Sequence, residues 1–225
     1  MTDRVRWAET YLQYTFDDPS LLAQALTHRS ASKQNNERLE FLGDAFLNFA
    51  IAEDLYRRCP QDTEGDLSRA RASLVNKNVL AAIGRELKID SQLVLGHGEA
   101  RSGGAQRGAG LADAVESLIG AVLLDGGHQS AKALIERLFG ERLGQMPDAA
   151  DLKDPKTKLQ EWLQGRGLGL PRYSVDSIVG KDHQRSFTVV CMVKEKQLHT
   201  KGLGRSRRRA EQDAAAAMLA VLDGE

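Results

Sequence analysis

The sequence predicts an all-α domain followed by a smaller α+β domain. Two observations carry this prediction: the first two thirds of the 225 residues show a helical hydrophobic period, and the last third changes to the period of two that is typical of strands. Between them, the segment 144–148 contains Gly and Pro and breaks the last helix of the first part. We therefore expect domains at 1–147 and 154–225, joined by a linker at 148–153.

The first domain is expected to consist of helices. Residues 4–143 contain few β-branched runs and no strict alternation of apolar and polar side chains. Segments rich in turn-forming residues or glycine, at 17–20, 59–62 and 96–110, separate the helical stretches. The pattern therefore predicts a succession of helices without a sheet.

The second domain is expected to have the order helix, three antiparallel strands, helix. An amphipathic helix opens it, with Leu159 and Leu163 on its apolar face. Two alternating stretches and a tight turn at 194–196 predict three strands, of which the last ends at 202–204. An alanine-rich helix over 206–222 closes the domain, and its expected apolar face comprises Ala210, Ala214, Ala217, Met218 and Val221.

Composition limits the class of protein. A hydrophobic share of 41% with 28% charged residues is ordinary for a folded globular chain. No apolar run is long enough for a transmembrane helix, and the first residues lack the apolar core of a signal peptide. We therefore expect a cytoplasmic protein with no membrane partner. Cys59 and Cys191 fall in different predicted domains, so no disulfide framework is implied.

Charge is divided unevenly along the chain. The formal net charge is zero, which taken alone argues against a nucleic-acid partner. From Asp151 onward, however, 14 Lys and Arg stand against 10 Asp and Glu, a net charge of +4 that leaves −4 for the preceding residues. An acidic first part and a basic second part suggest a metal site in one and a grip on a polyanion in the other.

One predicted helix carries a stripe of acids. Helical spacing places Glu37, Glu40, Asp44 and Asn48 on one narrow face of the segment 36–48, and apolar side chains occupy most of the remaining circumference. A helix that is apolar nearly all round is normally buried. Because unpaired buried carboxylates are costly, these acids are expected to need a cation.

A second predicted helix, 111–124, repeats the pattern. Asp113 and Glu116 are three residues apart among apolar neighbours, and Gly120, one turn on, leaves room for a group to approach. If the two helices face each other, four carboxylates form a cluster of hard oxygen ligands that suits Mg²⁺ or Mn²⁺. A di-iron bundle would need Glu-x-x-His pairs, and an isoprenoid-type magnesium enzyme would carry Asp-Asp-x-x-Asp. Neither motif occurs.

These residues resemble a known family. The segment Asn36-Glu37-Arg38-Leu39-Glu40-Phe41-Leu42-Gly43-Asp44 is similar to the signature of bacterial ribonuclease III. The segments 25–30, 64–68 and 111–117 resemble further family segments in the expected order, so the resemblance covers nearly the whole chain. One departure is the stretch 106–110, where family members often have charged residues followed by Glu-Ser.

The resemblance implies an activity and a set of site residues. It implies a homodimeric, Mg²⁺-dependent endoribonuclease of double-stranded RNA, with Mn²⁺ able to substitute, that leaves 5′-phosphate and 3′-hydroxyl ends and processes rRNA precursors and other structured transcripts. Asp44 and Glu116 match catalytic residues, Glu40, Asp44, Asp113 and Glu116 match metal ligands, and Glu37 and Glu64 match accessory acids. The alternative is a non-catalytic RNA-binding or scaffold protein, against which the intact set of acids argues.

The second domain resembles the double-stranded-RNA-binding domain, with its α-β-β-β-α fold. Such domains recognise the A-form shape and the 2′-hydroxyl groups of about 16 base pairs. Arginine side chains also attract phosphate on physical grounds. The positions that match RNA contacts of the family are Gln160, Glu161 and Gln164 in the first helix, His183 in the loop between the first two strands, and Arg205, Arg207 and Arg208 before and in the last helix.

Overall fold

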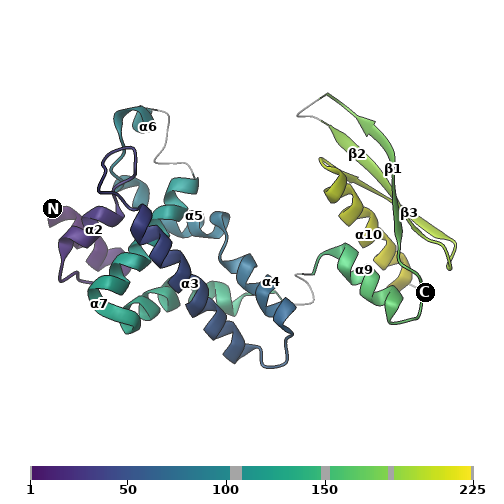
Figure 1. Ribbon diagram of the computed structural model, residues 1–225, viewed down its shortest axis with the longest axis horizontal. Coiled ribbons are helices and arrows are strands. Elements are labelled where there is room, and N and C mark those ends of the chain that lie inside the picture. The colour runs from purple at the N-terminus through teal and green to yellow at the C-terminus, as the bar shows by residue number, and fades with distance from the viewer. Residues whose placement is uncertain (1, 102–107, 148–152, 182–184, 224–225) are drawn as a thin grey trace. The chain divides into compact units, whose positions relative to one another are not determined.

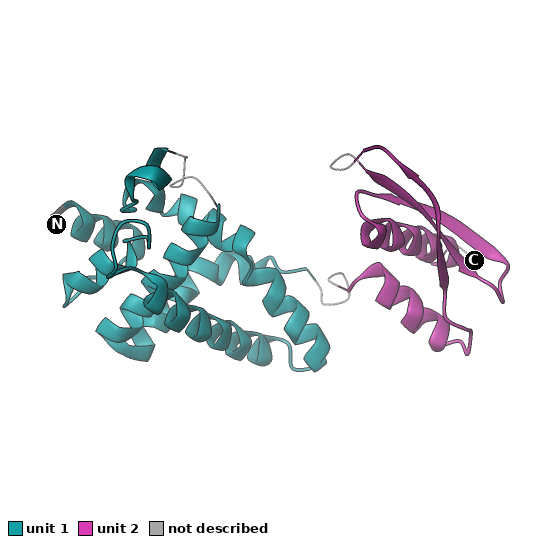
Figure 2. Cartoon of the chain, turned by 45° about the horizontal axis from the view of Figure 1, so that its top comes forward, with its two compact units in different colours: residues 1–152 teal, residues 153–225 magenta. Residues whose placement is uncertain are grey.

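The structure divides into two compact units. It is a computed structural model that describes residues 2–101, 108–147, 153–181 and 185–223. The units are Met1–Leu152 and Lys153–Glu225 (Figure 2). Of the predicted linker at 148–153, only Lys153 lies within the described residues. None of the described helices is long and apolar enough to cross a membrane.

The first unit is helical, as the hydrophobic period predicted. Its described residues form no strand, and one isolated parallel bridge joins Thr27 to Val94. Side chains fix where helices begin: Thr63 and Asp66 form a capping box before α4, and Asn76 accepts two backbone N–H bonds before α5. In chain order the elements are α1 (Thr2–Trp7), η1 (Ala8–Leu12), α2 (Pro19–Ala25), α3 (Glu37–Arg58), α4 (Glu64–Leu74), α5 (Lys77–Glu86), η2 (Ile89–Ser91), α6 (His97–Arg101) and α7 (Gly108–Gly144).

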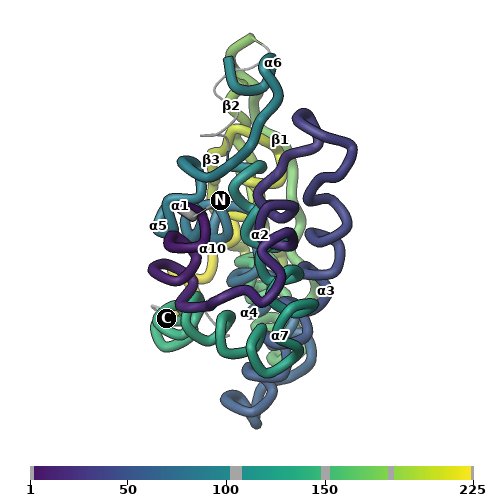
Figure 3. The backbone as a smooth tube through the Cα atoms, turned by 90° about the vertical axis from the view of Figure 1, so that its left-hand side faces the viewer, coloured from purple at the N-terminus to yellow at the C-terminus, as the bar shows by residue number. Residues whose placement is uncertain are grey.

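Helices α3 and α7 lie side by side at the centre of this unit (Figures 1 and 3). Each turns a glycine toward the other helix. A Cβ atom at Gly43 would overlap the carbonyl oxygen of Glu116, and a Cβ atom at Gly120 would overlap the carbonyl oxygen of Leu39. Only glycine lets two backbones approach so closely. The group that uses the room beside Gly120 is therefore the backbone of α3.

The outer side of α3 corrects one expectation. The prediction that this helix is buried nearly all round is wrong, because Phe41, Phe49 and Tyr56 are 80%, 62% and 73% exposed. The opposite side, which includes Leu47 and Ile51, is buried in the core. An apolar residue type predicts that a side chain will be covered, but it does not say whether the same chain covers it.

Helix α7 is longer than the predicted helix at 111–124 and is interrupted once. Gly127 has φ 72° and ψ −175°, a conformation outside the helical region that glycine adopts readily. Just before this break, Asp125 accepts hydrogen bonds from the hydroxyl of Tyr14 at 2.7 Å and from the backbone N–H groups of 17–18 at 3.0 and 2.8 Å. These bonds fasten the N-terminal segment to α7.

The second unit confirms the predicted order of elements. Its three strands form an antiparallel sheet in the order β1-β2-β3, and both helices cover one face of it (Figure 2). Leu159, Leu163, Cys191, Val193 and Met218 are among the buried side chains between helices and sheet. The elements are α9 (Pro155–Gln164), β1 (Arg172–Val179), β2 (Ser186–Val193), β3 (Leu198–Gly204) and α10 (Arg207–Asp223).

The apolar face of α10 differs from the predicted one at its end. Ala210, Ala214 and Met218 are buried as expected, and Ala217 is only partly buried. Val221 is 42% exposed, and its neighbour Leu222 is buried in its place. The two neighbours lie about 100° apart on a helix, so either could continue the apolar face in sequence. The orientation of α10 on the sheet decides between them.

The contact between α3 and α7 generates the first prediction. Gly120→Ala should destabilise the first unit by about 3 kcal/mol, because the new methyl group must push the two backbones apart. Urea unfolding of the helical unit measures this change.

Gly140→Ala is the matched control. It lies on the same helix, and a Cβ atom there meets no heavy atom within 4 Å. This variant should be more stable than the original protein by roughly 0.5–1 kcal/mol, the usual advantage of alanine over glycine in a helix. Equal stabilities for the two variants would contradict the close contact at Gly120.

Candidate active site

A cavity of about 980 Å³ lies on the first unit, where α3, α5 and α7 meet the segment 28–36. That segment is held in place by its backbone: the N–H of His28 donates to the carbonyl of Val94 at 3.0 Å, and the N–H of Asn36 donates to the carbonyl of Thr27 at 2.9 Å. The cavity is lined by His28, Arg29, Ser30, Asn36, Glu37, Glu40, Phe41, Asp44, Lys77, Leu95, Glu99, Ala109, Gly110, Asp113 and Glu116.

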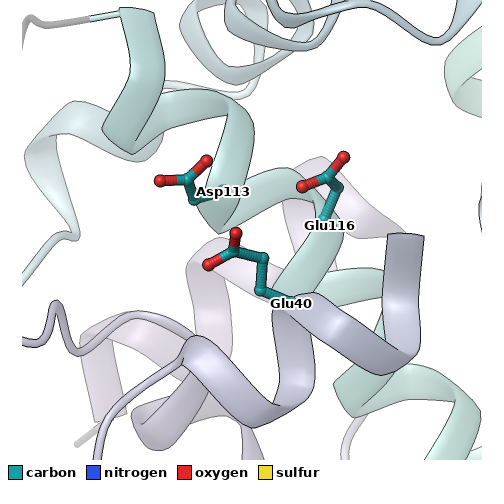
Figure 4. Close-up of side chains that lie close together, drawn as sticks. All are labelled: Glu40, Asp113 and Glu116. Atoms are coloured by element: carbon teal, nitrogen blue, oxygen red, sulfur yellow. The ribbon is translucent and has the colours of Figure 1, made fainter. Parts of the chain in front are cut away.

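Three of the predicted metal ligands converge in this cavity. Glu40 projects from α3, and Asp113 and Glu116 project from α7, so that their carboxylates point toward one another (Figure 4). One oxygen from each lies within 4.8 Å of the others. All three side chains are partly buried. Their convergence follows from the close contact at Gly43 and Gly120, because Glu40 and Glu116 each precede one of these glycines by about one helical turn.

The electrostatics of the cluster favour a bound cation. Burial, followed by the charges of Asp44, Glu40 and Asp113, raises the pKa of Glu116 to about 7 from its ordinary value of 4.5. Burial and the charges of Asp113 and Glu37 also raise the pKa of Glu40. Carboxylates held this close repel one another unless a proton or a cation neutralises them. A divalent ion with oxygen ligands fits this donor set.

The remaining predicted acids take different places. Asp44 lines the same cavity, and its Oδ1 accepts a hydrogen bond from Asn48 at 2.8 Å. Glu37 also lines it and lies 3.5 Å from Arg29. Glu64 does not line it: this side chain is exposed in the first turn of α4 and accepts a hydrogen bond from Ser68 at 2.7 Å. The structure thus brings Glu37 and Asp44, but not Glu64, to the three-acid cluster.

Two cationic residues of the cavity were missed by sequence reasoning. Lys77, the first residue of α5, lowers the pKa of both Glu40 and Glu116, and Arg29 lowers the pKa of Glu40. Lys77 is 37 residues from Glu40 in sequence, and no helical period connects them. The capping residue Asn76 indicates only where α5 begins, so its place in the sequence does not reveal that Lys77 lies beside the acids.

The second unit presents most of the predicted RNA contacts to solvent. Gln160, Glu161 and Gln164 are exposed on α9, and the three arginines are exposed at the start of α10. Several are held by neighbouring side chains. The Nε of Arg207 donates to Glu211 at 2.9 Å, and Lys153 Nζ lies 2.8 Å from a carboxylate oxygen of Glu161. His183 lies outside the described residues, and so do residues 106–107 of the divergent stretch.

The two units together define a class of protein. A helical unit with an acid-lined cavity precedes an α-β-β-β-α unit with exposed arginines, which is the arrangement of a nuclease domain joined to a double-stranded-RNA-binding domain. Family models agree: a ribonuclease-III-like model matches residues 18–143, and a double-stranded RNA binding motif matches residues 155–222. The chain belongs to the ribonuclease III family.

Individual relatives cover almost the whole chain. The chain is 50% identical to Ribonuclease 3 of Nitrosococcus oceani over 227 residues, covering 100% of this chain and 97% of the relative. It is 49% identical to Ribonuclease 3 of Vibrio cholerae, covering 99% of each. Among solved structures, the nuclease domain of ribonuclease III from Campylobacter jejuni matches with a TM-score of 0.60 and 41% identity, covering 61% of this chain and 96% of that domain.

The raised pKa of Glu116 generates the second prediction. Without a divalent ion, the folded state binds an extra proton between pH 4.5, the ordinary pKa, and about pH 7. The free energy of unfolding should therefore fall as pH rises through this window, by up to about 3 kcal/mol from this group. Urea unfolding of the helical unit in EDTA at pH 5 and pH 8 measures the change.

Glu116→Gln is the control for this pH dependence. The amide does not titrate, so the variant should lose less stability than the original protein between the two pH values. Mg²⁺ should also stabilise the original protein more at pH 8 than at pH 6, because the ion competes with the proton. The same pH dependence in both proteins would rule out a raised pKa at this position.

Proposed function

We propose that the chain is an endoribonuclease that hydrolyses phosphodiester bonds of double-stranded RNA with the help of a divalent cation, leaving 5′-phosphate and 3′-hydroxyl ends. One observation carries the proposal: Glu40, Asp113 and Glu116 converge within 4.8 Å at a cavity open to solvent, in a chain that also has a double-stranded-RNA-binding domain. The names of its relatives support the same activity.

The acids would hold Mg²⁺, for which Mn²⁺ would substitute. When bound, the ion would supply a water of lowered pKa and would stabilise charge on the phosphate oxygens. Glu40, Asp113 and Glu116 supply the converging oxygens, and Asp44 presents a further carboxylate to the same cavity while Asn48 holds one of its oxygens. In this proposal the attacking group would be a metal-activated water, so no side-chain nucleophile is assigned.

The exposed side of α3 supports a homodimer. Phe41, Phe49 and Tyr56 lie within about 80° of one another around this helix, which makes them one exposed apolar face. A second copy of the chain is the proposed partner. The description of the similar Campylobacter jejuni structure refers to a region of its nuclease domain that is involved in dimer formation. Phe41 also lines the acid cavity, so the dimer face would adjoin the site.

The proposed activity is tested directly with three substrates. Purified protein is incubated with long duplex RNA, single-stranded RNA and duplex DNA of equal length, each with Mg²⁺. Duplex RNA should be cut to short products while the other two stay intact. If duplex RNA stays intact with either Mg²⁺ or Mn²⁺, the proposed activity is contradicted and the alternative, a non-catalytic RNA-binding protein, is favoured.

The third prediction concerns Glu116. Glu116→Gln keeps the shape of the side chain but removes its charge, so cleavage of duplex RNA should fall by more than about 100-fold at saturating Mg²⁺. Binding of the duplex without divalent ions should stay within about twofold, because the RNA contacts proposed for the second unit are untouched.

Glu136→Gln is the matched control for this variant. It makes the same chemical change on an exposed position of α7, away from the cavity, and should leave cleavage unchanged. Near-normal cleavage by Glu116→Gln over a range of Mg²⁺ concentrations would exclude Glu116 from the metal centre.

The fourth prediction separates the two units. A fragment ending at Pro147 keeps the whole core of the first unit, including Leu143 and the adjoining Met146, so it should fold and dimerise. It should cut duplex RNA weakly at physiological salt and recover at low salt, because it lacks the arginines at the start of α10.

Salt dependence of binding provides the measurement. Replacing Arg205, Arg207 and Arg208 with alanine in the full chain should reduce the slope of log affinity against log salt by up to about three phosphate contacts, each about 0.9 for B-DNA. Long duplex RNA is titrated with the full chain, the fragment and the triple variant. Identical slopes and affinities for all three would mean that the second unit is not the RNA-binding module.

A further inference from the structure

A largely buried carboxylate connects the two helices of the second unit. Glu211 lies on α10, and its side chain is only 13% exposed. It accepts a hydrogen bond from Lys156 Nζ on α9 at 2.6 Å and another from Arg207 Nε at 2.9 Å. Despite burial, which raises it, these two cations lower the pKa of Glu211 below its ordinary value. The carboxylate is therefore charged and doubly paired at neutral pH.

Lys156 has a second partner on another element. Its ammonium lies 4.6 Å from the centre of the Tyr173 ring on β1, in the range of a cation–π contact. A continuous set of contacts thus runs from β1 through α9 to α10 and ends at the guanidinium of Arg207. Arg207 is 64% exposed and is one of the arginines proposed to contact RNA.

A second carboxylate ties the same two helix starts together. Asp154 caps α9 by accepting the backbone N–H of Lys156 at 2.9 Å, and it also accepts a hydrogen bond from the Gln212 amide on α10. Arg208 lies 3.9 Å from it. The start of α9 and the start of α10, which lie side by side in Figure 2, are therefore joined by two neighbouring polar contacts.

We propose that Glu211 is a positioning residue for duplex RNA binding: it holds the guanidinium of Arg207 in a binding orientation and fixes the start of α10 relative to α9. This inference rests on the proposed function of the second unit. A guanidinium has five N–H donors, so the bond at Nε leaves four for phosphate oxygens. An arginine oriented in advance loses less side-chain freedom when RNA binds.

The spacing between the start of α9 and the start of α10 also affects RNA binding. A domain of this kind recognises A-form RNA by contacting a minor groove and the neighbouring backbone at the same time. The exposed face of α9 and the arginines of α10 must then be held at one separation. Duplex DNA has a different groove geometry, so loosening this separation should cost RNA affinity more than DNA affinity.

Simple charge counting predicts the opposite result, which makes the inference testable. Glu211→Gln removes one negative charge from the domain, and electrostatics alone would tighten binding to any polyanion. If Glu211 positions Arg207, the same variant should bind duplex RNA roughly 3- to 10-fold more weakly. This is the usual cost of ordering one long side chain on binding, because Arg207 would be free before RNA binds.

Asp223→Asn is the matched control. It makes the same charge change at the last residue of α10, 12 residues and about 18 Å along the helix from Glu211. Both full-length variants are titrated, in EDTA to prevent cleavage, against RNA and DNA duplexes of equal length. Glu211→Gln should weaken RNA binding and lower the RNA-to-DNA affinity ratio, whereas Asp223→Asn should leave that ratio unchanged. Equal or tighter RNA binding by Glu211→Gln would overturn the proposal.

A double-mutant cycle with Arg207→Lys tests whether Glu211 affects RNA affinity through Arg207. Lysine lacks Nε, so Glu211→Gln should cost RNA affinity much less in the Arg207→Lys background than in the original chain. Glu211→Asp, which keeps the carboxylate, should restore part of the affinity. An undiminished cost in the Arg207→Lys background would show that Glu211 does not act through Arg207.

The same titration separates failure of this inference from failure of the proposed function. If the unaltered protein does not prefer duplex RNA over duplex DNA, the second unit is not the RNA-binding module and the proposed function fails with it. If the unaltered protein prefers RNA and Glu211→Gln behaves like Asp223→Asn, only the positioning role is wrong. Thermal unfolding of each variant in the same buffer accompanies the titration, and a variant whose second unit has unfolded is replaced by Glu211→Asp.

Discussion

The close approach of α3 and α7 is the constraint on which the first unit depends. Gly43 and Gly120 place backbone against backbone, with no space for a Cβ atom on either side. This distance brings Glu40 opposite Asp113 and Glu116, although the two groups are more than 70 residues apart in the chain. Three acids that could hold a metal ion are thereby presented by two helices, which position side chains more accurately than loops can.

The same contact makes the site electrostatically unfavourable when no cation is bound. Burial and mutual repulsion raise the pKa of Glu116 and of Glu40. Next to Glu116 in the chain, the buried Ser117 hydroxyl lies within hydrogen-bonding distance of the carbonyl oxygens of Ala25, at 2.8 Å, and Ala114, at 3.0 Å, and the first of these contacts ties α7 to α2. Lys77 adds a cation at the cavity wall. The cluster therefore favours a bound cation, because the fold of the first unit holds mutually repelling carboxylates close together.

The second unit uses carboxylates differently from the first. Its carboxylates at Asp154 and Glu211 are paired with lysine, arginine or amide donors rather than with one another. Pairing keeps them charged and lets them hold helices and arginines in place, whereas clustering in the first unit leaves oxygens that attract a cation. The net charges of −4 before Asp151 and +4 from it onward therefore understate the difference, because the arrangement of the acids matters as much as their number.

The sequence by itself determined everything that depends on neighbours along the chain. Hydrophobic periods distinguished the helical unit from the α-β-β-β-α unit, and helical spacing placed Asp113 and Glu116 on one face. Tertiary structure alone decided what each face meets: the backbone of α3 beside Gly120, solvent around Phe41, and Lys77 beside the acids. It also separated Glu64 from the cavity of this chain. The physical reason is that a period specifies which side chains share a face, whereas packing between distant segments, set by backbone distance and burial, specifies the partner of that face.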